Sequence, residues 1–183
     1  MSNPLFDASI LCQDILAQMP AGYEMRPLAL EDYEKGYLTC LEQLAKVGPV
    51  TREQFIAQFT RMHRQGCSLV LVIEDVRSHT IVATGTLVIE QKFLRGCSSA
   101  GHIEDIVVDA QQRGTGFGAR IIKQLMHMAT VLGCYKVLLN CEERVIGFYE
   151  RCGLSPCGVQ MKRYLKGDKA QSFEACEASK PAS

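Results

Sequence analysis

The pattern of apolar and polar residues changes its period twice along the chain. Residues 7–19, DASILCQDILAQM, have helical spacing, and we expect a short helix or arm that occupies residues 1–21. A strand is expected next at YEMRPL, residues 23–28. The following helix is indicated by apolar residues at intervals of four, four and three, namely Tyr33, Tyr37, Leu41 and Leu44. Gly48 and Pro49 are expected to end it.

A second helix begins at a capping box. Thr51 and Gln54 occupy the first and fourth positions of TREQ, so the hydroxyl can accept from a first-turn amide while the glutamine side chain reaches back. We expect this helix to run to about Gln65.

The middle of the chain has the composition of strands. SLVLVIED and TIVATGTLVIEQKF, residues 68–75 and 80–93, flank the turn-like VRSH and predict a hairpin. GHIEDIVVD, residues 101–109, predicts a third strand. Three strands in a row after two helices predict an antiparallel sheet that is covered on one side.

Helix and strand alternate in the last third. An amphipathic helix closed by Gly133 is indicated by Gly118, Ile122, Leu125, Met126, Ala129 and Leu132. We expect a strand at residues 134–140, a shorter helix at 144–153 and a final strand at 159–165. The periodicity is then lost, and we expect a disordered tail at residues 167–183.

Length and charge limit the classes of protein. At 183 residues, of which 47% are apolar, the chain is long enough for one well-buried core, and we expect one domain over residues 22–166. Twenty basic and twenty acidic side chains leave no net charge, which argues against nucleic acid or an anionic membrane as the partner. No stretch reaches the roughly eighteen apolar residues of a membrane span, and the N-terminus lacks the pattern of a signal peptide. We expect a small-molecule or protein partner.

The nine cysteines are scattered, odd in number and without CxxC spacing. They predict reduced thiols that pack as small hydrophobic groups in a cytoplasmic protein. No metal is expected, because the four histidines show no metal-ligand spacing: His63, His79, His102 and His127.

The stretch RGTGFG, residues 113–118, lies between a predicted strand and a predicted helix. Such a loop can bind phosphate, because the amides at a helix start are free and missing side chains let the backbone approach the anion. A Walker loop would need Gly-Lys-Ser/Thr, which is absent. Gly114, Gly116 and Ala119 satisfy the dinucleotide-binding pattern GxGxxA, but residues 109–113 separate them from the strand and the expected acidic residue is missing. A dinucleotide site therefore stays the alternative.

The loop also fits R-x-x-G-x-G, and here the chain resembles the GNAT superfamily of N-acetyltransferases, whose loop amides bind the pyrophosphate of acetyl-CoA. The resemblance implies an α/β protein of the GNAT fold, with a central mixed, mostly antiparallel twisted sheet flanked by helices. Two of its strands splay apart to admit pantetheine, and acetyl-CoA is the cosubstrate. The cofactor-binding residues implied by the resemblance are Ile106, Val107, Val108, Arg113, Gly114, Thr115, Gly116, Phe117, Gly118, Ala119 and Tyr149.

Within that superfamily, residues 22–166 resemble the glucosamine 6-phosphate N-acetyltransferases. The likeness rests on the segments GHIEDIVV, GCYKVLLNCEE, GFYERCG and GVQMKRYLK. It implies direct acetyl transfer to the amine of glucosamine 6-phosphate in a ternary complex, on the route to UDP-N-acetylglucosamine, and it implies a homodimer.

Acetyl transfer to an amine needs a neutral, oriented amine and then a proton for the departing thiolate. Glu104 and Asp105 are adjacent acids in an otherwise apolar run, which suits them to orient a sugar ammonium and to accept its proton through backbone or water. A solvated pair at a strand edge is the alternative. By resemblance, Tyr149 is the acid that protonates the thiolate, and the main-chain carbonyl of Asn140 orients the amine.

The 6-phosphate needs cationic partners. By resemblance the substrate contacts, some of them across the dimer, come from Lys92, Arg95, Glu104, Asp105, Tyr135, Lys136 and Arg163. Arginine binds phosphate through forked donors and lysine as a point charge. Taken singly, each of these cations is more typical of an ordinary surface charge than of a ligand.

Three positions depart from the pattern of the relatives. Val145 replaces an asparagine that contacts the cofactor, Ala45 replaces a threonine near the sugar, and Asn140 replaces an acid. Cys141 follows beside the expected path of pantetheine, and we hypothesise that it forms a mixed disulfide with the CoA thiol on oxidation, the alternative being an inert packed thiol. Two other functions stay open: acetyl transfer to a peptide or polyamine, and CoA binding without catalysis.

Overall fold

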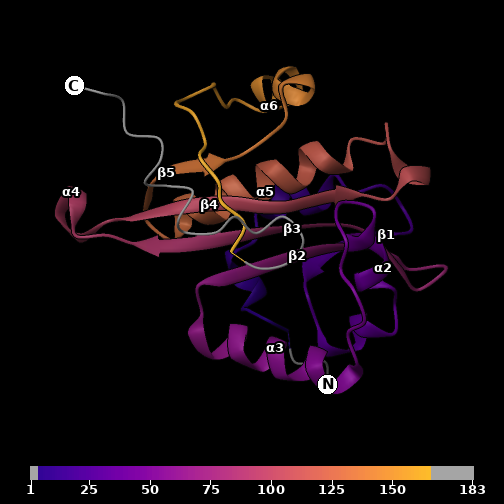
Figure 1. Cartoon of the computed structure of the whole chain (residues 1–183). Coiled ribbons are helices and arrows are strands. Elements are labelled where there is room, and N and C mark those ends of the chain that lie inside the picture. Colours follow the sequence, from indigo (N-terminus) through magenta and orange to yellow (C-terminus); the bar gives the residue numbers. More distant parts are fainter. Residues whose placement is uncertain (1–3, 166–183) are drawn as a thin grey trace.

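The computed structural model describes residues 4–165 and is built on one five-stranded sheet (Figure 1). The strands are β1 (Tyr23–Pro27), β2 (Ser68–Asp75), β3 (Thr80–Gln91), β4 (Ser99–Val108) and β5 (Cys134–Leu139), in that spatial order. Neighbours pair antiparallel from β1 to β4, whereas β4 and β5 are parallel. The mixed, mostly antiparallel α/β sheet expected from the sequence is confirmed.

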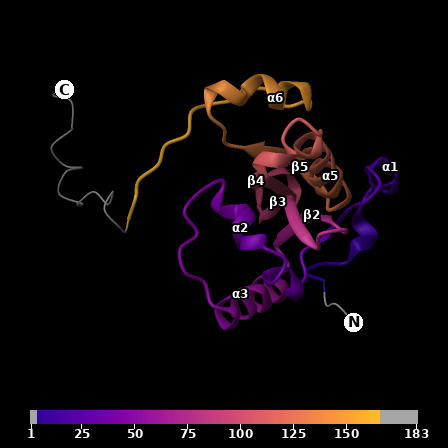
Figure 2. The same ribbon diagram turned by 90° about the vertical axis from the view of Figure 1, so that its right-hand side faces the viewer.

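Helices cover both faces of this sheet (Figure 2). The helical elements are η1 (Ala8–Ile10), α1 (Gln13–Ala17), η2 (Leu30–Tyr33), α2 (Tyr37–Glu42), α3 (Arg52–Gln65), α4 (Leu94–Cys97), η3 (Ala110–Gln112), α5 (Phe117–Val131), η4 (Glu143–Val145) and α6 (Ile146–Arg151). The prediction of a sheet covered on one side is wrong. The sequence indicates cover on both faces through the unbroken apolar run LVLVI of β2. Every residue of this run is buried, because α2 and α3 lie under one face of the sheet and α5 lies over the other.

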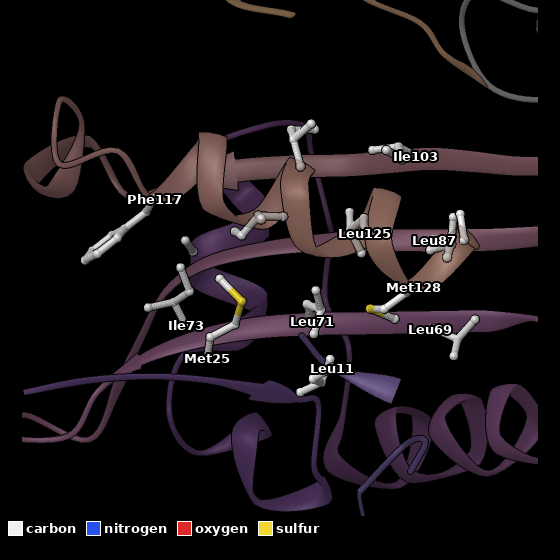
Figure 3. Close-up of a cluster of buried hydrophobic side chains, with 14 of the residues drawn as sticks. Leu11, Met25, Leu69, Leu71, Ile73, Leu87, Ile103, Phe117, Leu125 and Met128 are labelled. Carbon is white, nitrogen blue, oxygen red and sulfur yellow. The ribbon is translucent and has the colours of Figure 1, made fainter. Parts of the chain in front are cut away.

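The larger core lies between α5 and the sheet (Figure 3). Phe117, Leu125 and Met128 of α5 pack on strand residues such as Leu71 and Leu87, and each of these side chains is at most 1% exposed. The stripe read from the sequence is one residue out of phase in places: Ile121 and Met128 join the core, whereas Leu132 is 39% exposed. The helix itself ends as expected, before Gly133 in the left-handed conformation.

The second core lies under the opposite face of the sheet. Phe55 and Phe59 of α3 and Tyr37 of α2 pack there against Val70 and Val72 of β2. Thr51 caps α3 with the predicted reciprocal box, since Thr51 Oγ1 accepts from the amide of Gln54 and the Gln54 side chain accepts from the amide of Thr51.

The N-terminal segment is tied to both cores. A short helix, α1, forms inside the predicted arm. Leu5 packs in the core under α2 and α3, and Leu11 packs in the core under α5, with exposures of 3% and 4%. Pro4 also bridges Ala29, so the arm adds apolar packing to the domain.

The single helix expected over residues 30–47 is wrong. Gly36 adopts a positive φ of 78° and divides the segment into η2 and α2. The break lets Asp32 turn beneath β1, where it accepts two hydrogen bonds from Arg26, at 2.8 and 2.7 Å. Glu74 accepts from the same guanidinium at 2.5 Å and from Lys35 at 2.8 Å.

The remaining predictions are correct up to α6, whereas the strand predicted after it is wrong. The hairpin of β2 and β3, the strands β4 and β5, and the short helix α6 that stops before Gly153 are all confirmed. The strand predicted at residues 159–165 is wrong, because this segment has no ladder partner within residues 4–165 and runs away from the body of the domain (Figure 2). The predicted tail, 167–183, lies outside the described residues. No helix in the described part is long and apolar enough to cross a membrane.

Candidate active site

A notch opens where β4 and β5 part. The two strands are paired from Ser99 and Cys134 up to Ile103 and Leu139, and beyond that point β4 continues along β3. The hollow left between them has a volume of about 210 Å³ and is lined by Leu44, Ile103, Glu104, Asp105, Ile106, Leu139, Asn140 and Tyr149. All four residues predicted to be catalytic therefore line one small space, although they come from β4, the residue after β5, and α6.

A β-bulge places the two acids in this notch. Thr84 pairs with Val107 and Thr86 with Glu104, so Asp105 and Ile106 together face Gly85. Asp105 has a positive φ of 53°, which is costly for a residue with a side chain and is typical of functional sites. Gly85 allows the close approach, because a Cβ there would lie 2.5 Å from Ile106 Cδ1.

Tyr149 approaches the notch from α6. The side chain is half-buried, and its ring meets that of Phe148 edge-on at 5.0 Å. Burial, with smaller contributions from the neighbouring Cys141 and Cys152, raises the pKa of Tyr149 above its ordinary value. The phenol therefore stays protonated at neutral pH, which is the state that a proton donor needs.

The glycine loop ends at the first turn of α5. Gly114 and Gly116 both have a φ of 84°, and the first helical hydrogen bond runs from the amide of Arg120 to the carbonyl of Gly116 at 3.1 Å. The three amides before Arg120 are thus left without a helical acceptor. Thr115 Oγ1 donates to the carbonyl of Gln112 at 2.7 Å, and Arg120 Nη1 donates to the carbonyl of Thr115 at 3.0 Å. This is a fixed, concave array of donors of the kind that fits a pyrophosphate.

Two of the side chains predicted to contact the cofactor, those of Val107 and Phe117, are buried in the cores. Phe117 is 1% exposed and meets the ring of Tyr23 edge-on at 4.8 Å. Val107 is 5% exposed and faces the opposite core. A Cβ on Gly118 would lie 3.3 Å from the ring of Phe148, so glycine lets α5 and α6 pack closely. Arg113 is exposed beside the loop.

A larger cavity lies on the other side of β5. Its volume is about 600 Å³, and β5, the second half of α5, α6 and residues 153–160 enclose it. Asn140 and Tyr149 line both this cavity and the notch, so they form part of the wall between the two. Cys141 lines the larger cavity with an exposed thiol.

The predicted phosphate ligands do not reach the notch within one chain. Arg95 and Lys136 lie over the ring of Tyr135, at 5.9 and 5.5 Å from its centroid. Tyr135 stands at the start of β5 and Asn140 just beyond its end, roughly 17 Å apart along a strand. Lys92 donates to Glu90 at 2.5 Å.

Arg163, the remaining predicted ligand, is half-buried in the extended segment after α6. Arg163 is not among the side chains that line the notch.

Comparison with known proteins agrees with this architecture. The model of the "Acetyltransferase (GNAT) family" matches residues 23–154. The chain belongs to this family. It is 44% identical over 145 residues to "Glucosamine 6-phosphate N-acetyltransferase 1" of Dictyostelium discoideum, covering 79% of this chain and 92% of that protein.

Two solved structures of GNAT relatives are also similar. The crystal structure of glucosamine-6-phosphate N-acetyltransferase from Arabidopsis thaliana is 41% identical with a TM-score of 0.77, covering 79% of this chain and 99% of that one. An acetyltransferase from Trypanosoma brucei is 34% identical with a TM-score of 0.74, covering 78% and 99% of the two chains. The resemblance and the GNAT fold expected from the sequence are confirmed.

Two residues near the acids of this GNAT domain were missed from the sequence. Leu44 belongs to an apolar stripe that predicts core packing, yet it is 49% exposed and lines the notch. Tyr37 is buried beneath the bulge, where burial and then the charge of Asp105 raise its pKa. Apolar periodicity cannot distinguish these positions from core positions, because it reports only which face of the helix is turned inward.

The described residues contain no group of three or more His, Cys, Asp or Glu side chains placed to hold a metal ion. The eight cysteines among them are all free thiols.

Proposed function

We propose that this chain transfers the acetyl group of acetyl-CoA to the amine of D-glucosamine 6-phosphate, giving N-acetyl-D-glucosamine 6-phosphate and CoA. The observation that carries the proposal is the notch, where Glu104, Asp105, Asn140 and Tyr149 meet at the point where β4 leaves β5. The substrate class is supported by the relatives from Dictyostelium and Arabidopsis, which are named glucosamine 6-phosphate N-acetyltransferases.

Acetyl-CoA supplies the acetyl group as a thioester. Residues 113–119 would hold its pyrophosphate through the free amides of the first turn of α5, beside the exposed Arg113. The unpaired half of β4, Ile106 to Val108, offers backbone groups to pantetheine on the side that β5 has left. Pantetheine that pairs along this edge, as an added strand would, brings the thioester toward Tyr149.

The residues of the notch then divide the proton chemistry. Glu104 and Asp105 hold the sugar ammonium, orient it and accept its proton through backbone or water. The carbonyl of Asn140 fixes the direction of the resulting amine. Tyr149 donates its phenolic proton to the departing thiolate, and its raised pKa keeps that proton available at neutral pH. No side chain needs to be acetylated, so the transfer is direct within a ternary complex.

We propose a homodimer as the source of the phosphate contacts. Arg95, Tyr135 and Lys136 form one cluster that lies far from the notch of its own chain, so they can serve the site only from a second copy. The extended segment after α6 supports this assembly, because Val159 and Met161 are 90% and 89% exposed. Light scattering should give twice the chain mass. A fully active monomer would contradict the assignment of these contacts to a partner.

Cys141 is the proposed site of a mixed disulfide with CoA. Its exposed thiol lies one residue beyond Asn140 and lines the larger cavity. Peptide mass spectrometry after aerobic incubation with CoA should find the adduct on Cys141 and not on the exposed Cys157, which is the matched control. Equal labelling of the two thiols would reject a specific role.

The compartment and pathway complete the proposal. Eight free cysteines in the described residues suit a reducing compartment, and we assign the protein to the cytoplasm. Its product is an N-acetylated sugar phosphate, which we place on the route to UDP-N-acetylglucosamine.

The direct test compares three acceptors in an assay of CoA thiol release. Glucosamine 6-phosphate, glucosamine and a lysine peptide are each offered with acetyl-CoA. Turnover that depends on the phosphosugar supports the proposal. Preference for the peptide would overturn the substrate, and CoA binding without turnover of any amine would indicate a non-catalytic binding protein.

A further inference from the structure

One glutamine joins the wall of the notch to the segment that leads into the glycine loop. Gln43, the C-cap of α2, donates from Nε2 to Asp109 Oδ2 at 2.5 Å and accepts from the amide of Ala110 at Oε1, at 2.8 Å. Both groups of a single amide are therefore used across 66 and 67 residues of sequence. Glutamate could not make the same pair of bonds, because it has no donor.

Each end of this link belongs to a different part of the proposed site. Leu44, the residue after Gln43, lines the notch, and its amide is fixed to the carbonyl of Leu41 at 2.9 Å. Asp109 and Ala110 stand between the free half of β4 and the glycine loop, and the carbonyl of Asp109 accepts from the amide of Gln112 at 2.8 Å. Two hydrogen bonds of Gln43 therefore connect the segment before the loop to the residue that precedes Leu44 in the wall of the notch.

Helix α2 is suited to carry such a link. At its N-terminal end, Tyr37 is 8% exposed and is close enough to Asp105 for that charge to raise its pKa after burial. At its C-terminal end, Gln43 holds Asp109 and Ala110. The short helix therefore lies near Asp105, before the stretch Ile106 to Val108 proposed to pair with pantetheine, and is hydrogen-bonded to Asp109 and Ala110 just after it.

We propose that Gln43 is a positioning residue that couples the two substrate sites: by holding Asp109 and Ala110 to the end of α2, it makes cofactor binding favour acceptor binding. This inference rests on the proposed function. Thermodynamic coupling of this kind is reciprocal, so CoA and glucosamine 6-phosphate must each strengthen the binding of the other by the same factor.

The experiment measures that factor by calorimetry. The Kd of CoA is determined alone and with saturating glucosamine 6-phosphate, a pair that cannot react, and the ratio of the two constants is the coupling factor. For the wild type we expect about fivefold or more, as is usual for coupled sites. Gln43→Glu places a carboxylate against Asp109 and should bring the factor close to one.

The rescue variant separates positioning from general damage. When Gln43→Glu is combined with Asp109→Asn, the introduced asparagine amide donates to the introduced carboxylate, and that carboxylate still accepts from the amide of Ala110. The asparagine Oδ1 can still accept from the amide of Gln111, as the native aspartate does. We expect the coupling factor to return close to its wild-type value. Glu42→Gln, an exposed neighbour on α2, is the matched control and should leave the factor unchanged.

The possible results distinguish a failure of the role of Gln43 from a failure of the proposed function. A wild-type factor of one with the sugar bound, an unchanged factor in Gln43→Glu, or no recovery in the double variant would overturn the role of Gln43 and leave the proposed function standing. CoA binding in a wild type that never binds glucosamine 6-phosphate would overturn the proposed function itself, and this inference with it.

Discussion

Two groups of acidic side chains in this domain have opposite surroundings. Asp32 of η2 and Glu74 of β2 are 0% and 3% exposed, and Arg26 and Lys35 donate hydrogen bonds to their oxygens. Glu104 and Asp105 line a hollow, and Asp105 sits on a strained bulge. A buried acid that is fully hydrogen-bonded stabilises the fold, whereas acids held on a strained backbone beside an open space are placed for a ligand.

The largest expected effect is on stability. Asp32→Ala leaves the half-buried Arg26 without its bidentate partner and should lower the free energy of unfolding by about 3–5 kcal/mol, as for other broken buried ion pairs. Urea unfolding followed by circular dichroism measures the loss. Glu142→Ala, which breaks the pair between two exposed side chains, Glu142 and Arg144, is the control and should change little. Equal losses in the two variants would show that burial does not distinguish the pairs.

Tyr149→Phe should have the next largest effect, and this effect should be on kcat and not on stability. Removal of the proposed proton donor is expected to lower kcat by about a hundredfold while the melting temperature and the KM for glucosamine 6-phosphate change little. Steady-state assay of CoA release checks this. A kcat close to the wild-type value would remove Tyr149 from the mechanism.

Gly116→Ala should act on the cofactor alone. The residue has a φ of 84°, and a Cβ would lie 2.7 Å from Arg120 Nη1, so the loop must distort. A cost of roughly 1–2 kcal/mol in backbone strain would raise the KM for acetyl-CoA about tenfold. Gly114→Ala has the same φ but meets no atom within 4 Å, so it serves to separate strain from collision. An unchanged KM in both variants would mean that the loop does not bind the cofactor.

The last expected effect is confined to acid pH and concerns the stabilisation that Glu74 provides. Burial raises the pKa of Glu74, but hydrogen bonds from Lys35 and Arg26 outweigh it and lower the pKa to about 2 from 4.5. A folded-state pKa below the unfolded value means that this stabilisation is complete above pH 4.5 and is lost as the pH falls toward 2. The difference in unfolding free energy between the wild type and Glu74→Gln should therefore shrink in that range. A difference that stays constant from about pH 6 to about pH 3 would contradict it.

The same contrast explains what the sequence could predict. The glycine loop and the acid pair are contiguous in the chain, so their residue types and order were enough to predict binding sites there. The break at Gly36 was missed because the apolar spacing continues across it. The turn is explained by the ion pair between Arg26 and the buried Asp32, which the sequence pattern does not report. Leu44, Tyr37 and Gln43 lie near residues that are far from them along the chain, which no local pattern reports.

The strand predicted at residues 159–165 failed for a different reason. Apolar and polar residues alternate at its start, but a strand also needs a neighbouring strand with which to form a ladder. The structure assigns no strand ladder to this segment within the described residues.

The central claim is that chemistry occurs in the notch and not in the larger cavity beyond β5. A crystal structure with CoA and N-acetyl-D-glucosamine 6-phosphate tests it most directly, because Tyr149 and Asn140 line both spaces. The account predicts the CoA sulfur in the notch, within hydrogen-bond reach of the Tyr149 hydroxyl, and the sugar nitrogen beside Glu104 and Asp105. A sulfur atom in the larger cavity, among Tyr135, Cys157 and Gly158, would contradict it.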